Sequence, residues 1–197
     1  MNATLRPVVV ALHYQNDVLH PDGKIRLGVA EGATGRDAVI GQARRLLSGA
    51  RAAGVPVLSV RVAFRPDHAD VIQNAKIFRD VVRIGAMAEG SWGAEFFDGL
   101  GPVPGEFVVT HNRIGAFHGS PLSDALHALG AGRLIIAGIA TTSVVLTTVG
   151  QATDLGYQVM VAGDACSAAR SDLHAAALDL MAIVADVVTV EAALASL

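Results

Sequence analysis

The chain has 197 residues, of which 52% are hydrophobic and 17% charged, and its net charge is −3 with a pI near 6.1. This composition excludes a disordered chain. The absence of a Lys/Arg cluster with interleaved aromatic residues argues against a nucleic-acid partner. A chain of this length buries about 70% of its unfolded surface in one core, so we expect residues 1–197 to form a single domain.

The cellular setting is predicted from cysteine usage and from the N-terminal sequence. Cys166 is the single cysteine, so no disulfide can form within the chain. The first apolar run, residues 8–12, is too short for a signal sequence or a membrane span. We therefore expect a cytoplasmic protein that does not bind membranes.

Short apolar runs alternate with helical periodicities along the chain. Helices are predicted at residues 36–53, 121–129 and 172–184, and a further helix is predicted from an N-cap at Thr141 or Thr142 to a stop at Gly156. Strands are predicted at residues 8–12, 57–62, 107–110, 134–137, 157–162 and 187–190. Residues 69–105 show no regular pattern, as is typical of a functional or interface segment. The alternation predicts an α/β fold, a three-layer α/β/α sandwich around a six-stranded, mainly parallel sheet.

Three polar or glycine-containing segments follow predicted strands: His13, His111 and the turn at residues 138–145. The carboxyl ends of parallel strands share one edge of the sheet, so we expect these segments to converge on one pocket. Imidazole both accepts and donates protons near neutral pH, which favours a general acid–base pair. The alternative is that both histidines are structural or remain from a lost site.

Metal and nucleotide sites are the other possibilities. His13, His111, Asp17 and His118 have suitable side chains for a metal, but their spacing is not diagnostic, and Asp67 and His68 are adjacent rather than separated by one residue. No G-x-G-x-x-G motif follows the first strand. We expect neither a metal nor another cofactor.

Five segments resemble motifs of the isochorismatase-like cysteine hydrolases, and together they span nearly the whole chain. They are VVVALHYQNDVLHPDGK, SVRVAFRP, THNRIGAFHGSPL, GIATTSVVLTT and GYQVMVAGDACSAA. The resemblance implies a small α/β protein related to enzymes that cleave amides or, in isochorismatase itself, a vinyl ether.

The chain differs from this family at its three catalytic positions. The resemblance places Asp, Lys and Cys where this sequence has His13, His111 and Val144. Valine carries no nucleophilic group, so we expect no cysteine-dependent amidase activity. Ser143 is a candidate for a displaced nucleophile, but a shift of one residue on a helix rotates the side chain by about 100°, so we expect it to pack or cap instead. Cys166 lies outside the catalytic set, and we expect a buried, inert thiol.

The resemblance also implies the surroundings of the site. It predicts a cis peptide at Ile139–Ala140 and a cradle for an anion made by the N–H groups of Ala140 and Val144. Four residues are expected to line the pocket: Asn16, Arg113, Phe117 and Ile139. Asp17 is expected to form a structural ion pair with Arg113 or Lys24.

Two functions follow from these observations. The first is hydrolysis of a vinyl ether, an amide or a related bond of a small molecule without a cysteine, with His13 and His111 in place of the family's Asp and Lys. An imidazolium would then supply the proton for a vinyl ether. The alternative is a catalytically inactive protein that binds a small carboxylate or acts as an oligomeric partner. The apolar composition and residues 69–105 suggest a dimer or tetramer.

Overall fold

The computed structural model describes residues 5–25 and 33–197. Its six strands form one sheet in the order β3-β2-β1-β4-β5-β6, and every neighbouring pair is parallel. The strands are β1 (Pro7–Leu12), β2 (Val57–Val62), β3 (Phe107–His111), β4 (Arg133–Gly138), β5 (Gln158–Ala162) and β6 (Asp186–Val188). The predicted α/β fold with a six-stranded sheet is confirmed.

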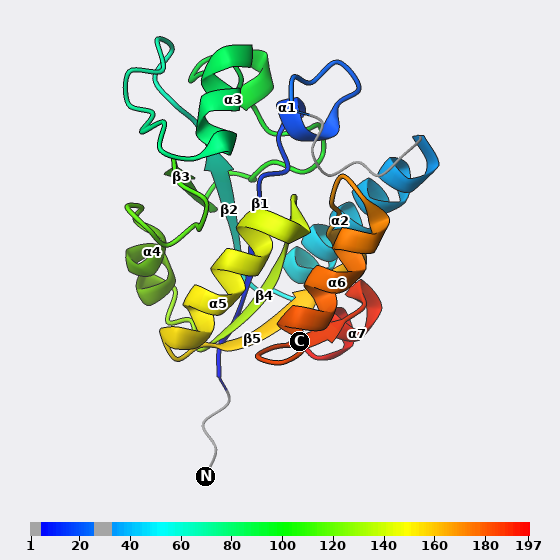
Figure 1. The fold of residues 1–197 in the computed structure, drawn as a ribbon. Coiled ribbons are helices and arrows are strands. Elements are labelled where there is room, and N and C mark those ends of the chain that lie inside the picture. Colours follow the sequence, from blue (N-terminus) through cyan, green and yellow to red (C-terminus); the bar gives the residue numbers. More distant parts are fainter. Residues whose placement is uncertain (1–4, 26–32) are drawn as a thin grey trace.

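Helices cover both faces of this sheet (Figure 1). They are α1 (Asn16–Leu19), α2 (Ala33–Ala52), α3 (Lys76–Ile84), α4 (Leu122–Ala128), α5 (Leu146–Asp154), α6 (Ser171–Met181) and α7 (Val190–Ala195). Helices α5 and α6 pack on each other over one face, and α2 and α7 pack on each other over the opposite face. Strands covered on both sides must be apolar along their whole length, and Val8, Val9 and Val10 of β1 are all fully buried.

Three short helices, α1, α3 and α7, were absent from the predicted elements. Helix α3 lies inside residues 69–105, and it buries Phe78 and Val81. Helix α7 begins at Val190, where the last strand was predicted to end, and the Thr189 side chain accepts a hydrogen bond from the Ala192 N–H at its start. Helices of one or two turns are set by tertiary contacts more than by their own sequence, which explains why the periodicity did not reveal them.

The connection from β4 to α5 differs from the predicted helix start. Residues Thr141–Val145 form a wide π-type turn, in which the Val145 N–H donates to the Ala140 carbonyl at 3.3 Å. The Thr141 hydroxyl does not cap this helix, because it bonds to Nδ1 of His174 at 2.8 Å. The prediction of a threonine N-cap was therefore wrong.

Within the described ranges, none of the helices combines the length and the hydropathy that crossing a bilayer requires. The single-domain organisation, the cytoplasmic location and the dimer or tetramer stay predictions.

Candidate active site

His13 and His111 meet across the end of β2. His13 follows β1 with a left-handed backbone (φ 56°), and its N–H donates to the Val60 carbonyl of β2 at 2.9 Å. His111 ends β3, in register with Val62 on the other side of β2. The two Nε2 atoms lie 2.5 Å apart, and the ring centroids are separated by 4.8 Å. The two histidines therefore lie in contact at the carboxyl edge of the sheet, where the strand pattern placed them.

Both imidazoles favour the neutral form. Burial is the main cause that holds the pKa of His13 well below its ordinary value, and the nearby His111 adds to the shift. Burial also lowers the pKa of His111 to about 4, with partial opposition from the Gly115 backbone. At neutral pH the short contact therefore joins two neutral rings, one donating and the other accepting. The imidazolium that would protonate a vinyl ether is scarce at that pH.

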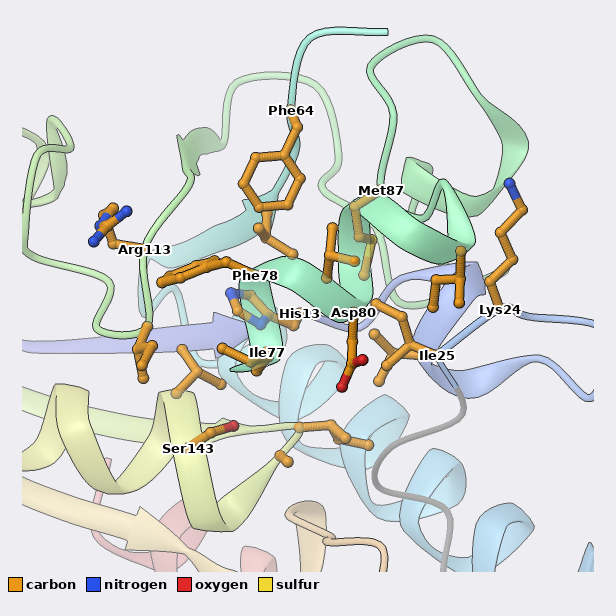
Figure 2. Close-up of a pocket in the computed structure, with 18 of the residues that line it drawn as sticks. His13, Lys24, Ile25, Phe64, Ile77, Phe78, Asp80, Met87, Arg113 and Ser143 are labelled. Carbon is orange, nitrogen blue, oxygen red and sulfur yellow. The ribbon is translucent and has the colours of Figure 1, made fainter. Parts of the chain in front are cut away.

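A cavity of about 650 Å³ lies beside His13, next to the carboxyl ends of β1 and β4 (Figure 2). Strand order reverses between these two strands, which is where open α/β sheets bind their ligands. His13 lines the cavity, whereas His111 lies behind it. Most of the remaining wall is apolar: Val18, Ile25, Val62, Phe64, Ile77, Phe78, Val81, Ile84, Met87, Ile114, Ile139, Ala140 and Val144.

Of the four predicted pocket residues, Arg113 and Ile139 line the cavity and the other two do not. The Asn16 side chain donates to the Trp92 carbonyl at 2.9 Å, so it fixes a loop instead. The Phe117 ring stacks on Tyr157 with centroids 6.2 Å apart. Both positions were expected from the resemblance alone, which does not specify the direction of a side chain.

Ser143 and Val144 both contribute to the cavity wall, and Figure 2 shows Ser143 there. The prediction that Ser143 turns away from the pocket was wrong. It assumed an ordinary α-helix, whereas the wide turn at this corner brings successive side chains to the same wall. Val144 is 2% exposed. It stands where the resemblance places the nucleophile.

The expected cis peptide joins Ile139 to Ala140. Hydrogen bonds tie its flanks, because the Ile139 N–H donates to the Leu12 carbonyl at 3.1 Å and the Thr141 N–H donates to the Ser167 carbonyl at 2.8 Å. The Ala140 N–H makes no hydrogen bond to another described residue. It is therefore available at the cavity wall, and its role in an anion cradle stays a prediction.

Gly138 is required just before this peptide. A Cβ atom at that position would lie 2.3 Å from the Leu12 carbonyl oxygen, so a larger residue would push β4 away from β1. The strand corner can approach the histidine pair because the side chain is missing there.

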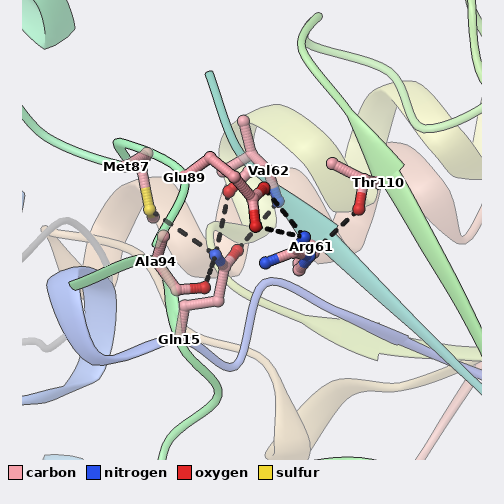
Figure 3. Close-up of polar contacts among 7 residues, drawn as sticks. All are labelled: Gln15, Arg61, Val62, Met87, Glu89, Ala94 and Thr110. Atoms are coloured by element: carbon pink, nitrogen blue, oxygen red, sulfur yellow. Dashed lines mark hydrogen bonds and ion pairs between the residues drawn. The ribbon is translucent and has the colours of Figure 1, made fainter. Parts of the chain in front are cut away.

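The side chain of Gln15, two residues after His13, links the strands and the loop next to the cavity. The Gln15 amide donates to the Val62 carbonyl at 2.9 Å and the Ala94 carbonyl at 2.8 Å, and it accepts from the Val62 N–H at 2.9 Å (Figure 3). A buried side-chain amide with these three bonds joins β1 to β2 and to the loop before β3. Arg61 and Glu89 form an ion pair beside it, at 2.8 Å.

Asp17 has a similar structural role. Its carboxylate accepts from the backbone N–H groups of Lys24 at 3.0 Å and Met87 at 2.8 Å. The predicted ion pair with the Lys24 or Arg113 side chain was therefore wrong. Asp17 is only 2% exposed, and backbone donors satisfy a buried carboxylate without burying a second charge.

Metal binding and thiol chemistry have little support at this site. In the described part of the chain, no three His, Cys, Asp or Glu side chains gather closely enough to hold a metal ion. The Cys166 thiol is buried and donates to the Ala162 carbonyl at 3.4 Å, and burial raises its pKa to about 12. Such a thiol is not a nucleophile at neutral pH.

The sequence did not predict that helix α3 forms one wall of the cavity, called the α3 wall below. This helix supplies Ile77, Phe78, Val81 and Ile84 to the cavity. The spacing 77, 78, 81 and 84 is that of one helical face, so the signal was present, although it covers only nine residues.

The sheet order defines a doubly wound α/β protein, and its cavity lies at the carboxyl ends of β1 and β4, where such folds bind small molecules. The Isochorismatase domain model matches residues 7–192, and the chain belongs to the isochorismatase family of hydrolases.

Similar proteins include several amidohydrolases. Ureidoacrylate amidohydrolase RutB of Methylobacterium radiotolerans is 32% identical over 184 residues, which cover 86% of this chain and 70% of that protein. Maleamate amidohydrolase of Pseudomonas putida is 30% identical over 162 residues, covering 80% of this chain and 73% of that protein. The crystal structure of an isochorismatase family protein from Desulfovibrio vulgaris has a TM-score of 0.85 at 29% identity, with 96% of each chain covered.

Proposed function

We propose that this protein hydrolyses a small carbonyl compound, most readily an amide, with water activated directly by His13 and no covalent enzyme intermediate. The observation that carries the proposal is the contact between His13 Nε2 and His111 Nε2 beside the cavity. Relatives named as amidohydrolases support the choice of bond. Val144 at the expected nucleophile position supports the choice of water, because valine cannot attack a carbonyl.

The proton positions follow from the surroundings of the pair. The Gly115 backbone raises the pKa of His111, whereas His111 Nδ1 itself is buried and makes no hydrogen bond to a described residue. We assign the proton of this ring to Nδ1, so that Nε2 keeps its lone pair. His111 Nε2 is then the acceptor and His13 Nε2 the donor of their hydrogen bond. This arrangement leaves the lone pair on Nδ1 of His13, which is the ring nitrogen not engaged by His111.

The reaction then proceeds through a tetrahedral intermediate. His13 Nδ1 takes a proton from water while the water oxygen bonds to the carbonyl carbon, and the C=O electron pair moves onto oxygen. The N–H groups of Ala140 and Val144 hold that oxyanion. The imidazolium of His13 returns the proton to the leaving nitrogen, and the C–N bond breaks to give a carboxylic acid and an amine. His111 stabilises the transient imidazolium by accepting the hydrogen bond from Nε2.

The test is turnover of maleamate, a panel of other small amides, and isochorismate by the wild-type protein, with His13→Ala and His111→Ala beside it. We expect amide hydrolysis that disappears in His13→Ala and weakens strongly in His111→Ala. Thermal unfolding of both variants serves as the control for folding. Hydrolysis that survives in His13→Ala would contradict the assigned base.

A second candidate is a catalytically inactive protein that binds a small carboxylate or serves as an oligomeric partner. The specific observation in its favour is the lowered pKa of both histidines, which makes each of them a weak base. No turnover of any substrate by well-folded wild-type protein would favour this candidate. Sedimentation analysis would then show whether the chain forms the expected dimer or tetramer.

A further inference from the structure

Among the residues that the structure describes, four cationic side chains line the cavity, and three of these already have partners. Lys76 and Arg83 both form ion pairs with Asp80 of the same helix, the second at 3.1 Å. Lys24 donates to the Gly85 carbonyl at 2.7 Å, at the end of α3. Lys76 and Arg83 share one carboxylate and the carbonyl bound by Lys24 is neutral, so these groups leave the cavity net positive, although each already has a hydrogen-bond partner.

Arg113 is different. Its guanidinium carbon lies 4.5 Å from the centre of the Phe78 ring. Its one hydrogen bond to a described residue is a long one, 3.5 Å to the Asn74 amide oxygen, and no described carboxylate lies within ion-pair distance. Stacking on a ring fixes the plane of a guanidinium and leaves the N–H groups at its edge available to a ligand.

The position of Arg113 relative to the histidine pair is also fixed. It follows His111 by two residues, directly after β3, and Phe78 of α3 holds its other end. Figure 2 shows Arg113 and Lys24 on opposite sides of the cavity, with His13 between them. A ligand bound at Arg113 would therefore extend along apolar walls toward His13.

We propose that the ligand of this cavity carries a carboxylate on an apolar body, and that Arg113 binds the carboxylate through two parallel hydrogen bonds. The planar fork of one arginine matches a planar carboxylate, and the apolar wall matches a hydrocarbon body. This inference deepens the proposed function by giving the substrate class, and it makes Arg113 the residue that determines specificity.

The first experiment measures binding and needs no turnover. Calorimetric titrations at low salt use acetate, maleate, cinnamate and benzoate as carboxylate probes, benzamide as the neutral match of benzoate, and inorganic phosphate as a non-planar anion. The proteins are wild type, Arg113→Gln, Arg113→Lys and the control Arg83→Gln, which removes a cavity cation that already has an ion-pair partner, Asp80.

We expect at least one carboxylate to bind the wild type, and to bind more tightly than its neutral match or phosphate. A charge-assisted pair of hydrogen bonds predicts a loss of about tenfold or more in Arg113→Gln and a smaller loss in Arg113→Lys, with Arg83→Gln close to wild type. Three results would overturn the proposal: no carboxylate binds, benzamide binds as tightly as benzoate, or Arg113→Gln binds like wild type. Circular dichroism of each variant checks that it is folded.

Turnover separates this inference from the proposed function. If carboxylates bind through Arg113 and no amide is hydrolysed, the inference stands and the hydrolase proposal fails. If the wild type hydrolyses neutral amides as efficiently as carboxylate-bearing ones, the hydrolase proposal stands and the role of Arg113 fails. In the case where both hold, Arg113→Gln lowers kcat/KM for carboxylate-bearing amides by a larger factor than for neutral amides.

Discussion

The floor and the α3 wall of the cavity use ionisable groups in opposite ways. The floor consists of His13, which lines the cavity, and of His111 behind it; they are 9% and 2% exposed, and burial keeps both neutral. On the wall, the side chains of Lys76 and Arg83 are 83% and 71% exposed and pair with Asp80 as full charges. Burial makes it costly to charge a side chain and so shifts its pKa, whereas solvent weakens the interaction between exposed charges. The floor should therefore control chemistry and pH response, and the wall should control neither.

The largest expected effect is on turnover. His13→Ala removes the group that takes the proton from water, and general bases contribute about 10²- to 10⁴-fold to rates, so kcat should fall by that order. The matched wall variant Asp80→Asn should leave kcat nearly unchanged. Steady-state kinetics on the best amide substrate measures both, and equal losses in the two variants would remove the contrast between floor and wall.

The next effect is on stability at acidic pH. The unfolded chain protonates His111 near pH 6.5, while the folded chain resists protonation until about pH 4. The unfolded state thus binds more protons in this window, and stability falls as the pH falls. From pH 7 to pH 5 this group alone should lower the free energy of unfolding by about 2 kcal/mol.

Urea unfolding of the wild type and of a His13→Asn/His111→Asn double variant at both pH values tests this effect. The double variant should lose less stability on acidification, because the other titrating groups are common to both proteins. The same pH dependence in the two proteins would show that the pair does not carry it.

A smaller effect on turnover is expected at Ser143, whose side chain lines the cavity next to Val144. Ser143→Ala should keep kcat within about twofold of wild type, because water and not the hydroxyl attacks the carbonyl. Hydroxylamine trapping with the wild type provides the complementary check. A loss of activity in Ser143→Ala together with a trapped acyl group would replace direct water attack by a serine intermediate.

The smallest expected effect is on thermal stability, when the ion pairs of the α3 wall are removed. Asp80→Asn breaks both ion pairs of α3, yet these pairs are exposed, so the melting temperature should not change measurably. Differential scanning calorimetry of this variant beside wild type measures the difference. A clear decrease would mean that the wall pairs are structurally more important than their exposure indicates.

Sequence reasoning predicted the features that depend on the sheet. Residues at the carboxyl ends of parallel strands share an edge, so the convergence of His13, His111 and the turn after β4 followed from the strand pattern. Features that depend on tertiary contacts were not accessible. The direction of Ser143 depends on a wide turn, the partners of Asp17 are backbone groups from two distant segments, and α3 is too short for its periodicity to be decisive.

The central claim is that His13 and His111 form a neutral pair with an available lone pair on His13 Nδ1. Nuclear magnetic resonance of protein with ¹⁵N-labelled histidine, titrated from pH 8 to pH 4, tests this claim most directly. The account predicts that both rings stay neutral at pH 7, with an unprotonated Nδ1 on His13 and a protonated Nδ1 on His111. A ring that carries both protons at pH 7, or a titration of either residue near pH 6.5, would contradict it.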